Sequence, residues 1–370
     1  MKTPYVSELE ANQLVQGVFL VQNKEVRQKK TGEPYLSLTL SDRTGDVDAK
    51  MWDNAQEATD LFERDGFIRV KGMVQIFQNR PQLTIHKLQP VPESEIDIAD
   101  FLPASSRNRD EMYAELRQWI ASMANPYLRA MLETLFEDEA VALAYRTAPA
   151  AKSIHHAWVG GLLEHVLSLC QVAKFTASHY PDVDFDLLLT GVILHDIGKI
   201  AELTYARSFG YSSAGQLIGH INIGVRMVDD AVRAVPGFPP KLHELVTHMI
   251  LSHHGSLEFG SPKLPMFLEA MLLHLIDNMD SKMEAMRAAI AKDRQINGVW
   301  TGWIPSLERT VLKKKVYLDP PERSAPESST GPAMGRAMSS DPFLPTKSPV
   351  AKNGPELSSP FASKLKDALK

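Results

Sequence analysis

Histidine is concentrated in one part of this 370-residue chain. Eleven of the twelve histidines lie between positions 155 and 274, and His86 is the exception. In that interval, polar residues interrupt segments that are otherwise apolar and should pack into a core. A single buried histidine is usually a satisfied core residue, but seven buried polar groups would need seven separate partners. A shared metal centre satisfies them together, and the candidate ligands are His165, His195, Asp196, His220, His253, His254 and Asp277.

The residue types limit the metal and its chemistry. Imidazole and carboxylate ligands without thiolate suit Mn²⁺, Fe²⁺, Co²⁺, Zn²⁺ or Ni²⁺, and less often Mg²⁺. The single cysteine, Cys170, excludes a thiolate-rich site. Seven ligands are too many for one ion that also holds water or substrate, but they suit two divalent metal ions, which serve hydrolytic phosphoryl chemistry. Asp196 is the expected bridging carboxylate, because it follows His195 directly and lies in the middle of the ligand order.

Three more polar residues accompany these ligands. Lys199 lies one helical turn after His195 and could contact a phosphate as a point charge, which would give it a catalytic role beside Asp196. A solvated lysine near a helix end is the alternative. His156 precedes the first ligand and could line the entrance and contact phosphate. Asp280 competes with Asp277 as the last ligand, but Asp277 is closer to the apolar run "MLLHLI".

These ligands are expected on helices. Apolar residues recur with helical spacing, and Pro and Gly punctuate the segments 107–145, 159–180, 184–197, 219–234, 240–252, 264–292 and 305–317. Strand alternation is not evident after position 150, so we expect an all-α domain over 107–318. The stretch 91–106, within "QPVPESEIDIADFLPASS", has the composition of a linker.

A different pattern precedes the linker. Residues 1–90 alternate apolar and polar side chains in short segments such as "YLSLTLSD" and "DVDAKM", which is typical of strands with one buried face. Three strands, a short helix at "NAQEATDLFERD" and two further strands form the layout of an OB-fold β-barrel. The fold class is therefore multidomain α and β, with an OB barrel followed by an all-α domain.

The barrel carries candidate contacts to a single nucleic-acid strand. OB folds bind such strands by stacking bases on exposed aromatic rings beside basic residues. The net charge of residues 1–90 is zero, from twelve basic and twelve acidic side chains, so tight electrostatic binding is not expected. The aromatic residues could instead cover the barrel, and the basic stretch "NKEVRQKK" could be a solvated hairpin. The candidates are Tyr35, Trp52, Phe77, Lys24, Arg27, Lys29, Lys30 and Arg80.

Composition sets the remaining limits. The chain is 44% hydrophobic and 23% charged with a net charge of −5, which is typical of a globular protein. We expect a cytoplasmic protein that does not enter a membrane, because no apolar run is long enough and the single cysteine fits a reducing compartment. Residues 319–370 contain nine of the 24 prolines and are predicted to be a disordered tail. Its end, "PFASKLKDALK", could fray or could dock on a partner or neighbouring subunit, which leaves a homo-oligomer open.

The ordered ligands resemble a known superfamily. The order His165, His195-Asp196, Asp277 resembles the H…HD…D pattern of the HD-domain metal-dependent phosphohydrolases, in which "HDIGK" is a common central motif. His220 and the pair at 253–254 resemble the extra histidines of binuclear members. The resemblance implies one metal site formed by His165, His195, Asp196 and Asp277. It implies a second site formed by His220, His253 and His254, with Asp196 shared between the two. It also implies that a water between the ions is the nucleophile.

An OB domain followed by an HD domain is similar to the YhaM-type 3′-5′ exoribonucleases. The segments "HHAWVGGLLEHV", "HDIGKIAEL", "LSHHGSLEFGSPKLP" and "HLIDNMDSKM" are typical of that family, and the likeness covers about residues 10–315. It implies removal of nucleotides from the 3′ end of single-stranded RNA, sometimes DNA, with Mn²⁺ preferred.

Two other function classes stay open. The chain could hydrolyse nucleotides or cyclic dinucleotides, with the OB domain as an interaction module; the GYP triplet of the cyclic-di-GMP class is not in the sequence. It could also be a binding protein with an idle HD domain, but the intact ligand set favours an enzyme.

Overall fold

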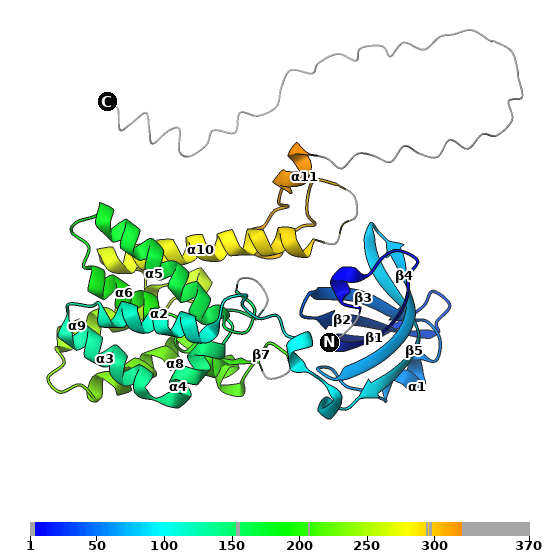
Figure 1. Ribbon diagram of the computed structural model, residues 1–370, viewed down its shortest axis with the longest axis horizontal. Coiled ribbons are helices and arrows are strands. Elements are labelled where there is room, and N and C mark those ends of the chain that lie inside the picture. The colour runs from blue at the N-terminus through cyan, green and yellow to red at the C-terminus, as the bar shows by residue number, and fades with distance from the viewer. Residues whose placement is uncertain (1–3, 153–155, 206–207, 294, 296–297, 320–370) are drawn as a thin grey trace, which may run out of the picture. The chain divides into compact units, whose positions relative to one another are not determined.

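The computed structural model describes residues 4–152, 156–205, 208–293, 295 and 298–319. His155 and the predicted tail from position 320 lie outside these residues. The described chain has a β-barrel near its N-terminus and a bundle of helices after it (Figure 1). The predicted fold class is therefore confirmed.

Five strands close the barrel in the order β1-β2-β3-β5-β4. Neighbouring strands are antiparallel, except for β3 and β5, which are parallel. The short helix α1 (Ala55–Thr59) follows β3, as the sequence predicts, but it is shorter than the expected segment. The strands are β1 (Leu14–Gln28), β2 (Pro34–Asp42), β3 (Gly45–Met51), β4 (Phe67–Phe77) and β5 (Arg80–Val91).

Alternation along the strands directs the large apolar side chains of β2 into the barrel interior. Leu36, Leu38 and Leu40 of β2 are at most 1% exposed and pack with Phe19 and Ile68 in the interior. The intervening positions of β2 and β3 face outward, because successive strand residues point to opposite faces. This places Tyr35 of β2, and Trp52 directly after the end of β3, on the outer surface of the barrel.

The second half of the described chain is a helical bundle with one small addition. The strands β6 (Leu203–Thr204) and β7 (Gly210–Tyr211) pair with each other, a two-residue ladder that alternation cannot reveal. The helices are α2 (Arg109–Ala121), α3 (Pro126–Glu137), α4 (Glu139–Thr147), α5 (Gly161–His179), α6 (Phe185–Leu194), α7 (Lys199–Glu202), α8 (Ser213–Arg233), α9 (Pro240–Ser252), α10 (Leu268–Lys292) and α11 (Lys314–Leu318).

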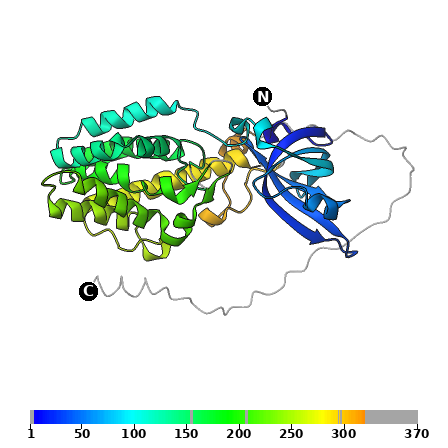
Figure 2. The ribbon, with the colours of Figure 1, turned by 90° about the horizontal axis from the view of Figure 1, so that it is seen from below.

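Helix α6 lies at the centre of the bundle. Every residue from Leu187 to Leu194 is buried, and α6 contacts α3, α5, α9 and α10. The long α10 packs against α5, α6 and α9 along one edge of the bundle (Figure 1 and Figure 2). A helix that is apolar on nearly all sides after its first turn is stable only inside a core. The residues that follow its C-terminus therefore begin in the interior of the bundle.

The expected helix at 305–317 is wrong in extent. The structure has a 3₁₀ turn at Pro305–Leu307 and the short α11, separated by Glu308 in a left-handed conformation with φ of 51°. Isolated bridges such as that between Ile304 and Arg309 replace helical hydrogen bonds there. Among the described residues, no helix is both long and apolar enough to cross a membrane.

Candidate metal centre

Five helices bring the predicted ligands together. His165 lies on α5 and Asp277 on α10, while His195 and His253 are the C-terminal caps of α6 and α9. Asp196 and His254 each follow such a cap directly, and His220 lies on α8. The C-terminal ends of α6 and α9 are buried and meet at the cluster, so the polar residues there face one another rather than solvent.

The ligands form two groups on either side of one carboxylate. Ligand atoms within 4.8 Å of one another define a first group of His165, His195 and Asp277 and a second of His220, His253 and His254. Oδ2 of Asp196 lies 3.3 Å from Nε2 of His195, in the first group. Its Oδ1 lies 3.5 Å from Nε2 of His220 and 3.7 Å from Nε2 of His253, in the second. Asp196 therefore lies between both groups, as a bridging carboxylate must.

The donor atoms fit divalent metal ions. Four of the buried atoms without a hydrogen-bond partner in the described chain belong to this cluster: Nε2 of His195, His220 and His253, and Oδ1 of Asp196. An orphaned buried polar atom costs about 1–3 kcal/mol, so four in one place need a common partner. Nitrogen and carboxylate oxygen donors without sulfur are the ligands of a divalent first-row ion. The histidine and aspartate clusters therefore indicate divalent metal ions.

All five histidine ligands are oriented in the same way. In each ring Nδ1 faces an acceptor, so Nε2 is directed to the cluster. Backbone carbonyls accept in three cases: Val192 for His195 at 2.9 Å, Ile250 for His253 at 2.7 Å and Phe259 for His254 at 2.7 Å. Carboxylates accept in the other two: Asp280 for His165 at 2.8 Å and Glu202 for His220 at 3.1 Å.

Two glycines shape the backbone at His220. Gly219 interrupts α8 with φ of 77° and ψ of 154°, a conformation that residues with a side chain rarely adopt. The kink aims the backbone N–H of His220 at Oε1 of Glu202, 2.9 Å away. Gly198 lies so close to this turn that a Cβ atom there would be 2.0 Å from the carbonyl oxygen of His220. The "HDIGK" glycine is thus required by the approach of α8.

Charges within the cluster balance one another. Burial raises the pKa of Asp196, but Lys199 and His195 outweigh it and hold that pKa well below its usual range. Burial also opposes protonation of His165, yet hydrogen bonds to Asp277 and Asp280 raise its pKa to about 9. Burial alone is the main reason that the pKa of His253 lies well below its usual range. The two carboxylates beside His165 therefore outweigh the effect of burial on that ring.

The structure also places the predicted phosphate contacts. Nζ of Lys199 lies 2.6 Å from Oδ2 of Asp196 and is buried, so this lysine belongs to the cluster and is not a solvated surface residue. His156 is buried as well, and its Nε2 lies 3.0 Å from Oδ2 of Asp280. A phosphate contact by His156 would therefore use Nδ1, which has no hydrogen-bond partner among the described residues.

Two carboxylates support ligand histidines from outside the two ligand groups, a role that the position after "HDIGK" had suggested for Glu202. Asp280, the alternative to Asp277 as the last ligand, approaches His165 from the Nδ1 side, opposite to Asp277, whose Oδ1 is 3.2 Å from Nε2. Glu202 lies one turn after Gly198 and supports His220. The signal available for Glu202 was its position after the "HDIGK" motif; for Asp280 it was the spacing of three residues from Asp277.

On the barrel, two aromatic candidates form a pair. The rings of Tyr35 and Trp52 stack with centroids 4.6 Å apart and an interplanar angle of 28°, and Trp52 is 39% exposed. Lys50 was not among the candidates, although it alternates onto the same face as Trp52. Its Nζ lies 6.0 Å from the centroid of the Tyr35 ring and donates to Ser37. Arg27 pairs with Tyr35 across the β1–β2 ladder.

The other barrel candidates are distributed. Nζ of Lys24 donates to the carbonyls of Thr59, at 3.0 Å, and Phe62, so it holds the end of α1. Lys29 pairs with Glu33 at 3.1 Å in the β1–β2 hairpin, where Lys30 is exposed.

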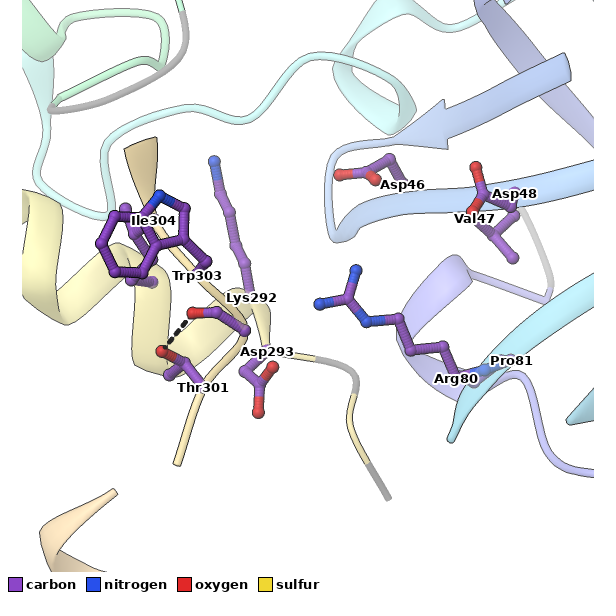
Figure 3. A pocket seen from close by; sticks show the side chains of 12 residues that line it. Asp46, Val47, Asp48, Arg80, Pro81, Lys292, Asp293, Thr301, Trp303 and Ile304 are labelled. Carbon is purple, nitrogen blue, oxygen red and sulfur yellow. Dashed lines mark hydrogen bonds between the residues drawn. The ribbon is translucent and has the colours of Figure 1, made fainter. Parts of the chain in front are cut away.

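Phe77 and Arg80 belong to another hairpin, between β4 and β5. Phe77 is 56% exposed at the end of β4. Figure 3 shows Arg80 directed into a pocket that Asp46, Lys292 and Trp303 also line. The eight candidates therefore do not form one patch, and the aromatic pair is their most compact group.

Comparison with known proteins agrees with these two regions. Residues 162–282 match the HD domain model, and residues 21–91 match the model of the OB-fold nucleic acid binding domain. The 3′-5′ exoribonuclease YhaM of Bacillus subtilis is 37% identical over 83% of this chain and 97% of its own length. YhaM of Halalkalibacterium halodurans is 32% identical over 84% of this chain and 96% of its own length. The chain therefore belongs to the YhaM family of 3′-5′ exoribonucleases.

Proposed function

We propose that this protein is a metal-dependent 3′-5′ exoribonuclease that removes nucleotides from single-stranded RNA, with single-stranded DNA as a second substrate. The observation that carries the proposal is the arrangement of the two ligand groups around Asp196, in a chain that matches YhaM over nearly the whole length of that protein. When bound, a pair of divalent ions lowers the pKa of a water molecule and offsets the charge that develops on the phosphate.

The residues of the chain supply position and charge. Asp196 presents one oxygen to each ligand group, which suits a bridging ligand. Lys199 holds its ammonium group at that carboxylate, where a scissile phosphate would gain a point charge. Burial of the cluster excludes bulk water and strengthens each of these interactions. His156 would add a phosphate contact through Nδ1.

The barrel is proposed to hold the strand that the cluster shortens. The stacked Tyr35 and Trp52 rings offer a flat apolar surface beside Lys50 and Arg27, which is the combination that binds single strands without sequence preference. Phe77, Arg80 and the hairpin lysines at 29 and 30 are proposed as weaker contacts outside this group. Lys24 is the candidate with the least freedom, because its ammonium group is bonded within the barrel.

We propose Mn²⁺ as the preferred ion, because the resemblance to the YhaM-type exoribonucleases implies it and the imidazole and carboxylate donors allow it. Fe²⁺, Co²⁺, Zn²⁺, Ni²⁺ and Mg²⁺ are the alternatives that the same donors allow. A metal analysis of freshly purified protein tests both the identity of the ion and the count of two per chain. Assembly into a homo-oligomer stays a prediction that size-exclusion chromatography with light scattering would test.

The activity is tested with 5′-labelled single-stranded RNA in the presence of Mn²⁺. A ladder of shortening labelled products is expected, and Asp196→Ala should abolish it. Turnover of free nucleotides or cyclic dinucleotides with intact RNA would instead favour a small-molecule phosphohydrolase. RNA binding without any metal-dependent turnover would favour an idle HD domain.

A further inference from the structure

Each ligand group contains one histidine that is backed by a carboxylate. In the first group Oδ2 of Asp280 lies 2.8 Å from Nδ1 of His165, and in the second Oε1 of Glu202 lies 3.1 Å from Nδ1 of His220. The other three ligand histidines face backbone carbonyls. The first and the second group therefore share a plan: one strongly supported imidazole and at least one weakly supported imidazole.

Both oxygens of Asp280 already face hydrogen-bond donors, although Asp280, His156 and His165 also form a third group of possible ligand atoms within 4.8 Å of one another. Its Oδ1 accepts a hydrogen bond from the hydroxyl of Ser168 at 2.7 Å, and its Oδ2 faces both His156 at 3.0 Å and His165 at 2.8 Å. Three donors occupy the carboxylate, whereas the orphaned donor atoms of the cluster lie with Asp196 and its histidine neighbours. An ion therefore belongs on the Nε2 side of His165, and Asp280 lies on the opposite side of the ring.

The fold holds His156 against Asp280 at a cost. His156 has a φ of 44°, in the left-handed region, which typically costs a residue with a side chain about 1–3 kcal/mol. The N–H groups of Ala150 and Trp158 both donate to its carbonyl oxygen, at 3.1 Å and 2.9 Å, and fix this conformation. The loop thus delivers a second ring to Asp280, which immobilises the carboxylate that faces His165.

Glu202 is held in a comparable way. Its Oε1 accepts a hydrogen bond from the backbone N–H of His220 at 2.9 Å and also faces Nδ1 of the His220 ring. The backbone and the side chain of His220 therefore both contact this one oxygen. The side chain is buried at 8% exposure at the end of α7. A carboxylate can only accept a hydrogen bond, so it keeps the imidazole proton on Nδ1 and leaves the lone pair of Nε2 directed at the ion.

We propose that Asp280 and Glu202 are a matched pair of positioning residues, each of which sets the metal affinity of one of the two sites through a single histidine. Asp280 acts on the site of His165, and Glu202 acts on the site of His220. The inference rests on the proposed two-ion centre, but it requires no RNA. Its test therefore stays separate from the test of ribonuclease activity.

The test is a titration of metal-free protein with Mn²⁺, followed by isothermal titration calorimetry and by the electron paramagnetic resonance signal of free Mn²⁺. Asp280→Asn and Glu202→Gln keep the volume of the side chain but remove the carboxylate. Each is expected to weaken one of the two binding events by about 10–100-fold and to leave the other unchanged. The control is Glu284→Gln, one turn after Asp280 on α10, whose carboxylate pairs with Arg287; it should bind both ions like the unaltered protein.

Ligand knockouts assign each effect to its site. In a His165→Ala background Asp280→Asn should cause no further change in Mn²⁺ affinity, while Glu202→Gln should still weaken the remaining site. A His220→Ala background should show the reverse, since two residues that act through one contact are not additive. Full additivity of Asp280→Asn with His165→Ala, or equal weakening of both sites by either carboxylate variant, would overturn the proposal.

A milder variant guards against misfolding. Ser168→Ala removes one of the three donors to Asp280 without touching a ligand histidine. If Asp280→Asn does not fold, as judged by circular dichroism and thermal melting of the metal-free protein, Ser168→Ala is expected to weaken the His165 site alone by a few-fold. Unchanged Mn²⁺ affinity at that site in folded Ser168→Ala, or loss at the His220 site, would contradict the assignment.

Discussion

The metal cluster and the barrel face solve opposite problems. The ligand residues are polar groups inside an apolar bundle, so each must find a partner, and the geometry is fixed by helix ends, carboxylates and carbonyls. The Tyr35–Trp52 pair consists of aromatic rings at the surface. Exposed rings need no specific hydrogen-bond partners, so their orientation is less constrained. A buried polar site is therefore specified closely by its surroundings, whereas an exposed stacking surface is adaptable. Hydrolysis of one phosphodiester bond needs a closely specified site. Binding of RNA strands with different sequences needs an adaptable surface.

Removal of the metal should show the largest difference between the metal cluster and the barrel face. Chelation followed by gel filtration is expected to lower RNA turnover by more than about 10³-fold, beyond the loss of a single transition-state hydrogen bond. RNA binding by the barrel should persist, because stacking on Tyr35 and Trp52 needs no ion. RNA turnover is measured in single-turnover decay experiments, and RNA binding is measured by the fluorescence anisotropy of labelled RNA. Parallel loss of both would show that the regions are not independent.

Trp52→Ala tests the barrel face. Stacking contributes about 1–3 kcal/mol per base, so the KM for a long RNA should rise by about 5–150-fold. The turnover of a dinucleotide should be unchanged, since it cannot reach both regions by this proposal. Val26→Ala is a suitable control, because Val26 is also exposed on the barrel, at 50%. Equal slowing of the long RNA and the dinucleotide by Trp52→Ala would refute the proposed role.

Gly219→Ala tests the cluster. A side chain at φ of 77° and ψ of 154° should lower the free energy of unfolding by about 1–3 kcal/mol and should disturb the approach of His220 to Glu202. Gly237→Ala is the matched control, since Gly237 has a φ of 71° and, like Gly219, has open space around it. Both variants should melt at lower temperature in the metal-free state, but we expect weaker Mn²⁺ binding in Gly219→Ala alone. Weakened binding in both would assign the effect to general destabilisation.

Cys170 should show the smallest effect. Burial raises the pKa of its thiol, and the residue packs in the same core as α6. Iodoacetamide should therefore not modify the native protein at neutral pH but should modify it fully in denaturant, because the thiolate is the nucleophile. Mass spectrometry of the intact protein measures this. Rapid native modification would mean that the bundle behind the cluster opens more often than its packing suggests.

The sequence predicted the parts of the structure that depend on local pattern. Alternation located the buried leucines of β2, and the order of His165, His195-Asp196 and Asp277 located the cluster. Both succeed because hydrophobicity and ligand chemistry are properties of the residue type. The predicted and observed ranges of the longer helices from α5 to α10 agree within a few residues, apart from the start of α8. The prediction began α8 at Gly219, whereas the structure has about a turn and a half of helix before this glycine.

The remaining features depend on tertiary contacts. Asp277 and Asp280 have the same residue type and adjoining positions, and their different roles follow from which side of His165 each one meets. Lys24 belongs to a basic stretch, yet its ammonium group is used within the barrel by carbonyls at the end of α1. Spacing along the sequence cannot predict these partners, because they lie 35 or more residues away in the chain.

The dispersion of the ligands has a consequence for how the bundle holds together. Residues 165 to 277 contribute donors from five helices, so a chain that is unfolded offers no preformed site. Ions that bind the native state alone stabilise it by mass action, by about 2.7 kcal/mol when their concentration is a hundred times the dissociation constant. The concentration of metal would then govern how long the protein survives proteolysis as well as how fast it works. When metal is scarce, metal-free and inactive protein would be degraded.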